Sequence, residues 1–205
     1  MKVAVVGGTG DFGLALAQQL VAAGHDVVVG SRDAARAEEK AAEVGARGAA
    51  NEDAVRGVDL VVLAVRAEAA LGTAESLADA IADTPVLSVA SELRFAKGGV
   101  FPGDEATSIA ERTQAVLRAP VVAGLHSLAA ASLAHGKADG DTLLCGDDQA
   151  AKERALELAA TVVTGRALDA GPLAGARALE GMTAVIVNLN KRYRAHAGIS
   201  VTGVQ

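Results

Sequence analysis

Short aliphatic runs alternate with longer amphipathic segments along most of the chain. Runs of almost only apolar residues predict strands over 2–7, 26–30, 59–65, 85–90, 120–125 and 141–145. Strands of a parallel sheet are covered on both faces, so they are apolar throughout rather than in alternation. Segments with apolar residues at every third or fourth position predict helices over 12–25, 34–45, 74–83, 108–119, 147–163 and 175–195. The alternation predicts an α/β fold of the Rossmann type, with a doubly wound and mainly parallel sheet.

The last helical segment, 175–195, differs from the others because no strand follows it. Its apolar positions lie near one face and are Ala176, Leu179, Met182, Thr183, Ile186 and Leu189. Such a face either closes over a ligand cleft or pairs with another subunit, which makes a homodimer one of the two interpretations. We therefore expect a Rossmann-type domain over 1–168 and a small C-terminal helical portion over 169–205.

Composition and charge exclude several classes of partner. The formal net charge is −6 and only 2% of the residues are aromatic, whereas a nucleic-acid surface needs clustered Lys and Arg and aromatic faces for the bases. The longest apolar runs are far shorter than the roughly 20 residues that span a bilayer. We expect neither nucleic acid nor membrane as a partner.

Metal and disulfide chemistry are not expected either. Cys145 is the only cysteine, which excludes an internal disulfide and a cysteine metal cluster, and indicates a reducing, cytoplasmic location. The neighbouring acids Asp147 and Asp148 precede a helix and have no nearby histidine. They are interpreted as helix-capping groups rather than as metal ligands.

A glycine-rich loop follows the first predicted strand. Residues 8–13, "GTGDFG", match GxGxxG and open a helix, which is the context that a dinucleotide-binding loop needs. There Gly8 permits the tight turn, Gly10 lets the backbone approach a pyrophosphate, and Gly13 lets the helix pack on the strand. The alternative is a structural turn without a ligand. The candidate phosphate-binding residues are Gly8, Thr9, Gly10, Asp11, Phe12 and Gly13.

The end of the second predicted strand indicates which dinucleotide is bound. NAD-binding proteins usually have an acid there that binds the ribose hydroxyls, but this chain has "GSRDAAR". Ser31, Arg32 and Arg36 supply a hydroxyl and guanidinium groups for the 2′-phosphate of NADP. Asp33 is interpreted as an N-terminal charge of the next helix. The alternative for both arginines is an ordinary solvated helix face.

Several segments make the chain similar to the F420-dependent NADP reductases over almost its whole length. The resemblance lies in "VAVVGGTGDFG", "GHDVVVGSRD", "NEDA" at 51–54, "LH" at 125–126, "LLCGDD" at 143–148, "LDAGPL" at 168–173 and "RALEGMTAVIVNLN". The first two are shared with many dinucleotide enzymes, and "CGDD" and "LDAGPL" are more specific. The resemblance implies hydride transfer between NADP and the deazaflavin coenzyme F420.

The resemblance also places further residues at the site. It implies a deazaflavin in a cleft at the carboxyl ends of the strands, stacked on the nicotinamide, with Met182 nearest the ring and Ala64 and Val65 beside the cofactor. His126 matches a family histidine near this cleft. It either contacts the second substrate, as the candidate catalytic residue, or is merely hydrogen-bonded at a strand end. Hydride transfer needs few protein acids or bases.

Two other functions remain open at this point. One is an NADP-dependent reductase of a small imine, flavin or metal chelate, and the other is a non-catalytic, NADP-sensing subunit. The segments 88–93, 126–130 and 172–186 are expected to form the cleft that separates these functions. A flat slot the size of a ring favours a deazaflavin, and a filled one favours a sensor.

Overall fold

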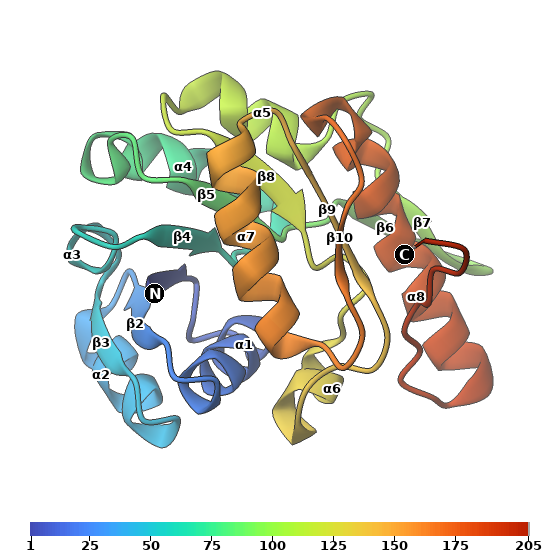
Figure 1. Ribbon diagram of the computed structural model, residues 1–205, viewed down its shortest axis with the longest axis horizontal. Coiled ribbons are helices and arrows are strands. Elements are labelled where there is room, and N and C mark those ends of the chain that lie inside the picture. The colour runs from blue at the N-terminus through green and yellow to red at the C-terminus, as the bar shows by residue number, and fades with distance from the viewer. Residues whose placement is uncertain (205) are drawn as a thin grey trace.

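The computed structural model describes residues 1–204 and has a central sheet with helices on both faces (Figure 1). Within those residues the sheet has eight strands in the order β10-β9-β8-β5-β4-β1-β2-β3. The strands are β1 (Lys2–Val6), β2 (Asp26–Ser31), β3 (Arg47–Ala50), β4 (Leu60–Leu63), β5 (Val86–Ser88), β8 (Val121–Gly124), β9 (Thr142–Gly146) and β10 (Ala167–Asp169). The chain order reverses at β1, which is the doubly wound topology that was predicted.

Helices cover the sheet from both sides. They are α1 (Asp11–Ala22), α2 (Ala34–Glu43), α3 (Asn51–Ala54), α4 (Ala67–Ile81), α5 (Ile109–Val116), α6 (Ala130–His135), α7 (Gln149–Val162) and α8 (Ala176–Tyr193), with a 3₁₀ turn at Leu173–Gly175 before α8. In β1, Val3 and Val5 join the core cluster of α1, α6 and α7, whereas Ala4 and Val6 join that of α4, α5 and α8. Burial of both faces explains the uninterrupted apolar runs.

The predicted strands and helices are present, although α4 begins at Ala67 rather than at 74 and the short helices α3 and α6 were not predicted. The sheet shows two further differences. All sheet pairs are parallel except that of β8 with β9, which is antiparallel. The edge strands β3 and β10 were not predicted, because each is only three or four residues long and lacks a buried apolar run. The fold is nevertheless the expected α/β fold of the Rossmann type with a mainly parallel sheet.

A two-stranded hairpin lies outside the main sheet. Its strands β6 (Leu93–Ala96) and β7 (Gly99–Pro102) pair antiparallel, and α8 packs beside them (Figure 1). Most of its residues are exposed, so the hairpin has no buried apolar pattern from which a sequence-based prediction can start.

The expected domain boundary at 168/169 falls inside β10. From there the chain continues into α8, which packs against β8 and β9 of the main sheet as well as against the hairpin. The division into two domains therefore stays a prediction. Among residues 1–204, no helix is both long and apolar enough to cross a membrane.

Candidate functional site

The glycine-rich loop joins β1 to α1 and is tied to the neighbouring strand. The N–H groups of Gly7 and Gly8 both donate to the carbonyl oxygen of Gly30 in β2, at 3.2 Å each. Gly7 has a φ of +79°, so the left-handed backbone of the tight turn lies at Gly7, one residue before the glycine to which the turn was assigned. A Cβ on Gly8 would lie 2.7 Å from the Val5 carbonyl oxygen. Gly8 is therefore needed for close packing rather than for its dihedral angles.

Gly10 and Gly13 have different surroundings. A Cβ on Gly13 would lie 2.7 Å from the Gly7 oxygen and the Gly8 Cα, so α1 packs directly on the loop. A Cβ on Gly10 would have only one neighbour within 4 Å, the Gly7 oxygen at 3.5 Å. The space over Gly10 is thus open to a ligand. Gly10 is also the N-cap of α1 and provides no side-chain cap, which leaves the first N–H groups of the helix available for an anion.

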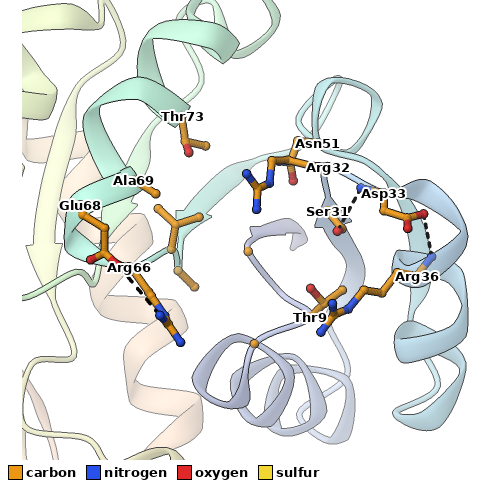
Figure 2. Close-up of a pocket in the computed structure, with 14 residues that line it drawn as sticks. Thr9, Ser31, Arg32, Asp33, Arg36, Asn51, Arg66, Glu68, Ala69 and Thr73 are labelled. Atoms are coloured by element: carbon orange, nitrogen blue, oxygen red, sulfur yellow. Dashed lines mark hydrogen bonds and ion pairs between the residues drawn. The ribbon is translucent and has the colours of Figure 1, made fainter.

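A cavity of about 690 Å³ opens above this loop (Figure 2). Its lining includes seven of the predicted residues, Thr9, Gly10, Ser31, Arg32, Arg36, Ala64 and Val65. Figure 2 shows Ser31 between the Arg32 and Arg36 side chains on one side of the cavity, with Arg66 and Glu68 on the other. Among the described residues, neither Arg32 nor Arg36 forms an ion pair. Two cations without a carboxylate partner are available to an anionic ligand.

Asp33, the acid that follows Arg32, is hydrogen-bonded to the start of α2. Asp33 is the N-cap of α2, and its carboxylate accepts a hydrogen bond from the Arg36 N–H at 3.2 Å. Its own N–H donates to the Ser31 Oγ at 3.2 Å. This confirms the prediction that Asp33 belongs to the start of the helix.

Further lining residues of the first cavity were not predicted from the sequence. They are Gly7, Asn51, Arg66, Glu68, Ala69 and Thr73, and Asp33, which was predicted only as a helix cap, lines this cavity as well. The Asn51 Oδ1 atom is buried and has no hydrogen-bond donor among the described residues. Asn51 begins the "NEDA" segment that carried part of the resemblance, which was the one signal that could have identified it. Arg66, Glu68, Ala69 and Thr73 belong to α4 or its start, where the sequence has no ligand-binding motif, and Gly7 belongs to the glycine-rich loop.

A second cavity of about 540 Å³ continues from the first. The two cavities share the lining residues Thr9, Gly10, Arg36, Ala64, Val65 and Arg66. They therefore form one cleft along the carboxyl ends of β1, β2, β4, β5 and β8, which is where open α/β sheets bind ligands. Asp11, Phe12, Gly13 and His126 of the predicted set line the second cavity.

The three segments that were expected to form this second part of the cleft do meet there. Val89, Ala90, Ser91 and Leu93 come from 88–93, His126 and Leu128 from 126–130, and Thr183 from 172–186. Met182, expected nearest the ring, lines neither cavity and packs against the core cluster of α4, α5 and α8 instead. The next residue of α8, Thr183, is the one that faces the cleft.

His126 follows β8 and is almost completely buried, with 4% of its surface exposed. Burial disfavours the charged ring and lowers the pKa of His126 to about 4. Its Nδ1 lies 3.0 Å from the Ser91 Oγ. The imidazole is therefore neutral at physiological pH and fixed on one side by a hydroxyl.

The chain is similar in sequence to several F420-dependent NADP reductases. Residues 2–92 match the family described as NADP oxidoreductase, coenzyme F420-dependent. The chain is 35% identical to the F420-dependent NADP reductase of Methanothermobacter thermautotrophicus, with 100% of this chain and 96% of that protein covered. It is 33% identical to the enzyme of that name from Methanocaldococcus jannaschii, with full coverage of both.

The chain is also similar to solved structures. The crystal structure of a candidate F420-dependent NADP reductase from Arthrobacter sp. FB24 is 26% identical and covers both chains completely, with a TM-score of 0.83. A pyrroline-5-carboxylate reductase from Coxiella burnetii is 17% identical with a TM-score of 0.67, over 94% of this chain and 66% of that one. At that identity the second likeness shows the fold alone.

Proposed function

The chain belongs to the family of F420-dependent NADP reductases, and on that premise we propose that it transfers a hydride between NADP and coenzyme F420 in the cleft described above. The single observation that carries the proposal is that the two cavities are continuous and share Gly10, Ala64 and Val65. A dinucleotide along the first cavity then presents its nicotinamide to the second. The hydride moves with its electron pair from one ring to the other, and the deazaflavin side is completed by one proton from water.

The first cavity holds the adenosine half of NADP in this proposal. Arg32 and Arg36 bind the 2′-phosphate, with the Ser31 hydroxyl between them, because they are cations without an acidic partner. Asp33 also lines this cavity, but its carboxylate is engaged as the N-cap of α2, where it accepts a hydrogen bond from the Arg36 N–H. The Asn51 amide oxygen accepts a hydrogen bond from the nucleoside, which satisfies an otherwise unpartnered buried acceptor.

The pyrophosphate lies over Gly10, where the surface is open and the first N–H groups of α1 are available. Arg66, at the N-terminus of α4, lines both cavities and is exposed. Its guanidinium is 4.0 Å from Glu68, too far for a strong ion pair. We assign it to the phosphates from the side opposite Arg36.

The second cavity orients the two rings. Its lining combines the apolar side chains of Val89, Leu93 and Leu128 with the polar side chains of His126 and Thr183. This combination suits a flat heterocycle with a polar edge. From α8 we place Thr183, rather than Met182, against that edge. The protein contributes orientation and exclusion of water, and no acid or base needs to act on the transferred hydride.

We also propose that α8 pairs with a second copy of the chain. Val185, Leu189 and Tyr193 lie four residues apart along α8 and are exposed, and Phe95 and Phe101 of the hairpin are exposed as well. Such a gathering of large apolar side chains is typical of an interface. Sedimentation equilibrium tests it: we expect the mass of a dimer, and of a monomer for Leu189→Asp. A monomeric wild type contradicts it.

The proposed location is the cytoplasm. Cys145 is a free and buried thiol, and burial raises the pKa of Cys145 to about 11. A thiol with so little thiolate character serves packing, which agrees with a reducing compartment.

The activity is tested by mixing the purified protein with NADPH and oxidised F420 and following the deazaflavin absorbance. We expect the band to bleach with NADPH and far more slowly with NADH. An Arg32→Ala variant under the same conditions shows whether the arginine-lined cavity is the NADP site. If the wild type binds NADP but bleaches no F420, the proposal fails, and imines, flavins and metal chelates are the next substrates to assay. If none of them is reduced, a sensor remains.

A further inference from the structure

Three side chains in the second cavity form a hydrogen-bonded chain whose direction can be deduced. They are Ser91, from the loop after β5, His126, from the loop after β8, and Thr183, from α8. The Thr183 Oγ1 lies 2.8 Å from the main-chain oxygen of His126. A carbonyl oxygen has no proton, so Thr183 must be the donor.

The other two contacts follow from the first. Ser91 Oγ and Thr183 Oγ1 are 2.7 Å apart, and since the only Thr183 proton is already committed, Ser91 donates to Thr183. Ser91 Oγ is also 3.0 Å from the His126 Nδ1. Because the Ser91 proton is committed in turn, Nδ1 must carry a proton and donate it to Ser91. The neutral ring is then the Nδ1–H tautomer, and Nε2 has a lone pair.

This Nε2 atom is buried, and no donor for it exists among residues 1–204. Buried polar atoms nearly always have a partner, so an orphaned acceptor at a ligand cleft indicates where a ligand donates. His126 lines the second cavity, and Nε2 is covered from bulk water. The missing donor is therefore expected on the molecule held in that cavity.

We infer that Ser91 and Thr183 are positioning residues that hold His126 as the Nδ1–H tautomer, so that Nε2 accepts a hydrogen bond from a ring N–H of the second substrate. Naming that ring as the deazaflavin, whose pyrimidine part has an N–H group, rests on the proposed function. Two consequences follow directly. Ser91 is not an activated nucleophile, because it donates to Thr183 rather than to His126, and His126 presents no proton to the cavity.

The tautomer is measured on the wild-type protein by long-range ¹H–¹⁵N NMR of ¹⁵N-labelled histidine at neutral pH. The chain has four histidines, and the His126 signals are those missing from a His126→Gln variant. We expect a protonated Nδ1 and an unprotonated Nε2, with Nε2 shifting upfield when F420 is added to the NADP complex. A protonated Nε2 in the free protein overturns the inference.

Substitution of Ser91 tests the positioning role. Ser91→Ala removes the acceptor of Nδ1–H, so we expect the His126 tautomer to shift toward Nε2–H and the KM for F420 to rise about tenfold. The Kd for NADP should stay unchanged, and Ser91→Thr, which keeps the hydroxyl, should restore both properties. Ser76→Ala, at an exposed serine of α4, is the control. An unchanged tautomer in folded Ser91→Ala contradicts the role.

The experiments distinguish a failure of the proposed function from a failure of the inference about the His126 tautomer. If the tautomer is as inferred and follows Ser91, but the protein does not reduce F420, the proposed function is wrong and the role of Ser91 stands. If F420 is reduced while Nε2 carries the proton, the function stands and the inference is wrong. Should Ser91→Ala not fold, the wild-type spectrum and its response to F420 still decide.

Discussion

The carboxylate of Asp33 accepts a hydrogen bond from the backbone N–H of Arg36 at 3.2 Å. The acid closest to the end of β2 is thus the N-cap of α2, and the side chains on either side of it, Arg32 and Arg36, line the first cavity. The order of residues that excludes an NAD-type carboxylate at the strand end also delivers two cations there. We therefore expect cofactor preference and helix capping to be separate properties of these neighbouring residues.

The first prediction concerns Arg32. A charge-assisted hydrogen bond contributes roughly 1.5–3 kcal/mol, and about 1.4 kcal/mol is a factor of ten in affinity. Arg32→Ala should therefore weaken NADP binding by about one to two orders of magnitude and leave NAD binding little changed, since NAD has no 2′-phosphate. Calorimetry with both dinucleotides at one ionic strength measures the ratio.

The same calorimetric comparison is made on two further variants, Arg36→Ala and Arg118→Ala. Arg36→Ala should also weaken NADP binding, to an extent limited by the water and salt that screen its charge at the exposed surface of α2. Arg118→Ala is the control, since Arg118 precedes β8 and therefore lies near the amino ends of the strands, opposite the carboxyl ends that form the cleft. If the ratio of NADP to NAD affinity does not fall in Arg32→Ala, the 2′-phosphate is bound elsewhere.

The second prediction separates capping from cofactor choice. Asp33→Ala removes the N-cap of α2 and should lower the free energy of unfolding by about 0.5–2 kcal/mol. Asp33→Asn keeps an acceptor and should lose less. The NADP to NAD ratio should stay within about twofold in both variants, because the carboxylate is hydrogen-bonded to the start of α2 rather than left free for a ligand. Urea unfolding and calorimetry measure the two quantities, and a large change in the ratio would place Asp33 in the cofactor site.

The third prediction uses the two glycines of the loop. Gly10→Ala adds a methyl group whose nearest neighbour is 3.5 Å away, so stability should change little while NADP binding falls at least about tenfold, because the methyl occupies the path of the pyrophosphate. Gly13→Ala adds one only 2.7 Å from the Gly7 oxygen. It should lower both stability and NADP affinity, with a stability loss of about 1–3 kcal/mol. Thermal unfolding with and without NADP distinguishes the two patterns.

The opposite result is informative as well. If Gly10→Ala binds NADP normally, the pyrophosphate does not pass over Gly10, and the loop serves packing alone. Gly72→Ala is a control, because Gly72 lies in α4 and a Cβ there has no neighbour within 4 Å.

The fourth prediction concerns pH. Burial lowers the pKa of His126 to about 4, from about 6.5 in the unfolded chain. Between these values the unfolded state binds more protons than the folded state, so acidification through this window favours unfolding. One pKa unit corresponds to about 1.4 kcal/mol, so His126 should account for a loss of at most about 3 kcal/mol between pH 6.5 and pH 4.

His126→Gln should remove this contribution. Its free energy of unfolding, measured in urea at several pH values, should fall less steeply than that of the wild type between pH 6.5 and pH 4. Parallel curves would mean that His126 takes up its proton in the folded state without penalty. Because the acidic residues titrate in both proteins, the difference between the two curves isolates the histidine.

Local features of this protein could be read from the sequence. The strands of the central sheet are recognisable because both of their faces are buried, so an apolar run is enough to identify them. The capping by Asp33 and the close packing of Gly13 follow from neighbours only a few residues away. In each case the deciding contacts lie within one turn or one strand-loop-helix unit.

Other features depended on contacts between distant segments. The edge strand β3 has the sequence RGAA and pairs only because β2 offers it a free edge. β9 runs antiparallel to β8, and this direction depends on the path by which the chain returns to the sheet. The residues of β9 themselves do not indicate it. The face of α8 was predicted correctly as apolar, but its rotation about the helix axis places Thr183 rather than Met182 at the cleft.

The hydrogen-bonded chain of Ser91, His126 and Thr183 shows the same limit at the site. Its members are 35 and 57 residues apart along the chain, and each is unremarkable in its own segment. The sequence determined the buried apolar strands of the central sheet and the glycine-rich turn that opens the fold. Only the tertiary structure decided which side chains share the second cavity, because hydrogen bonds between loops depend on sheet order and helix rotation, and neither is encoded in local periodicity.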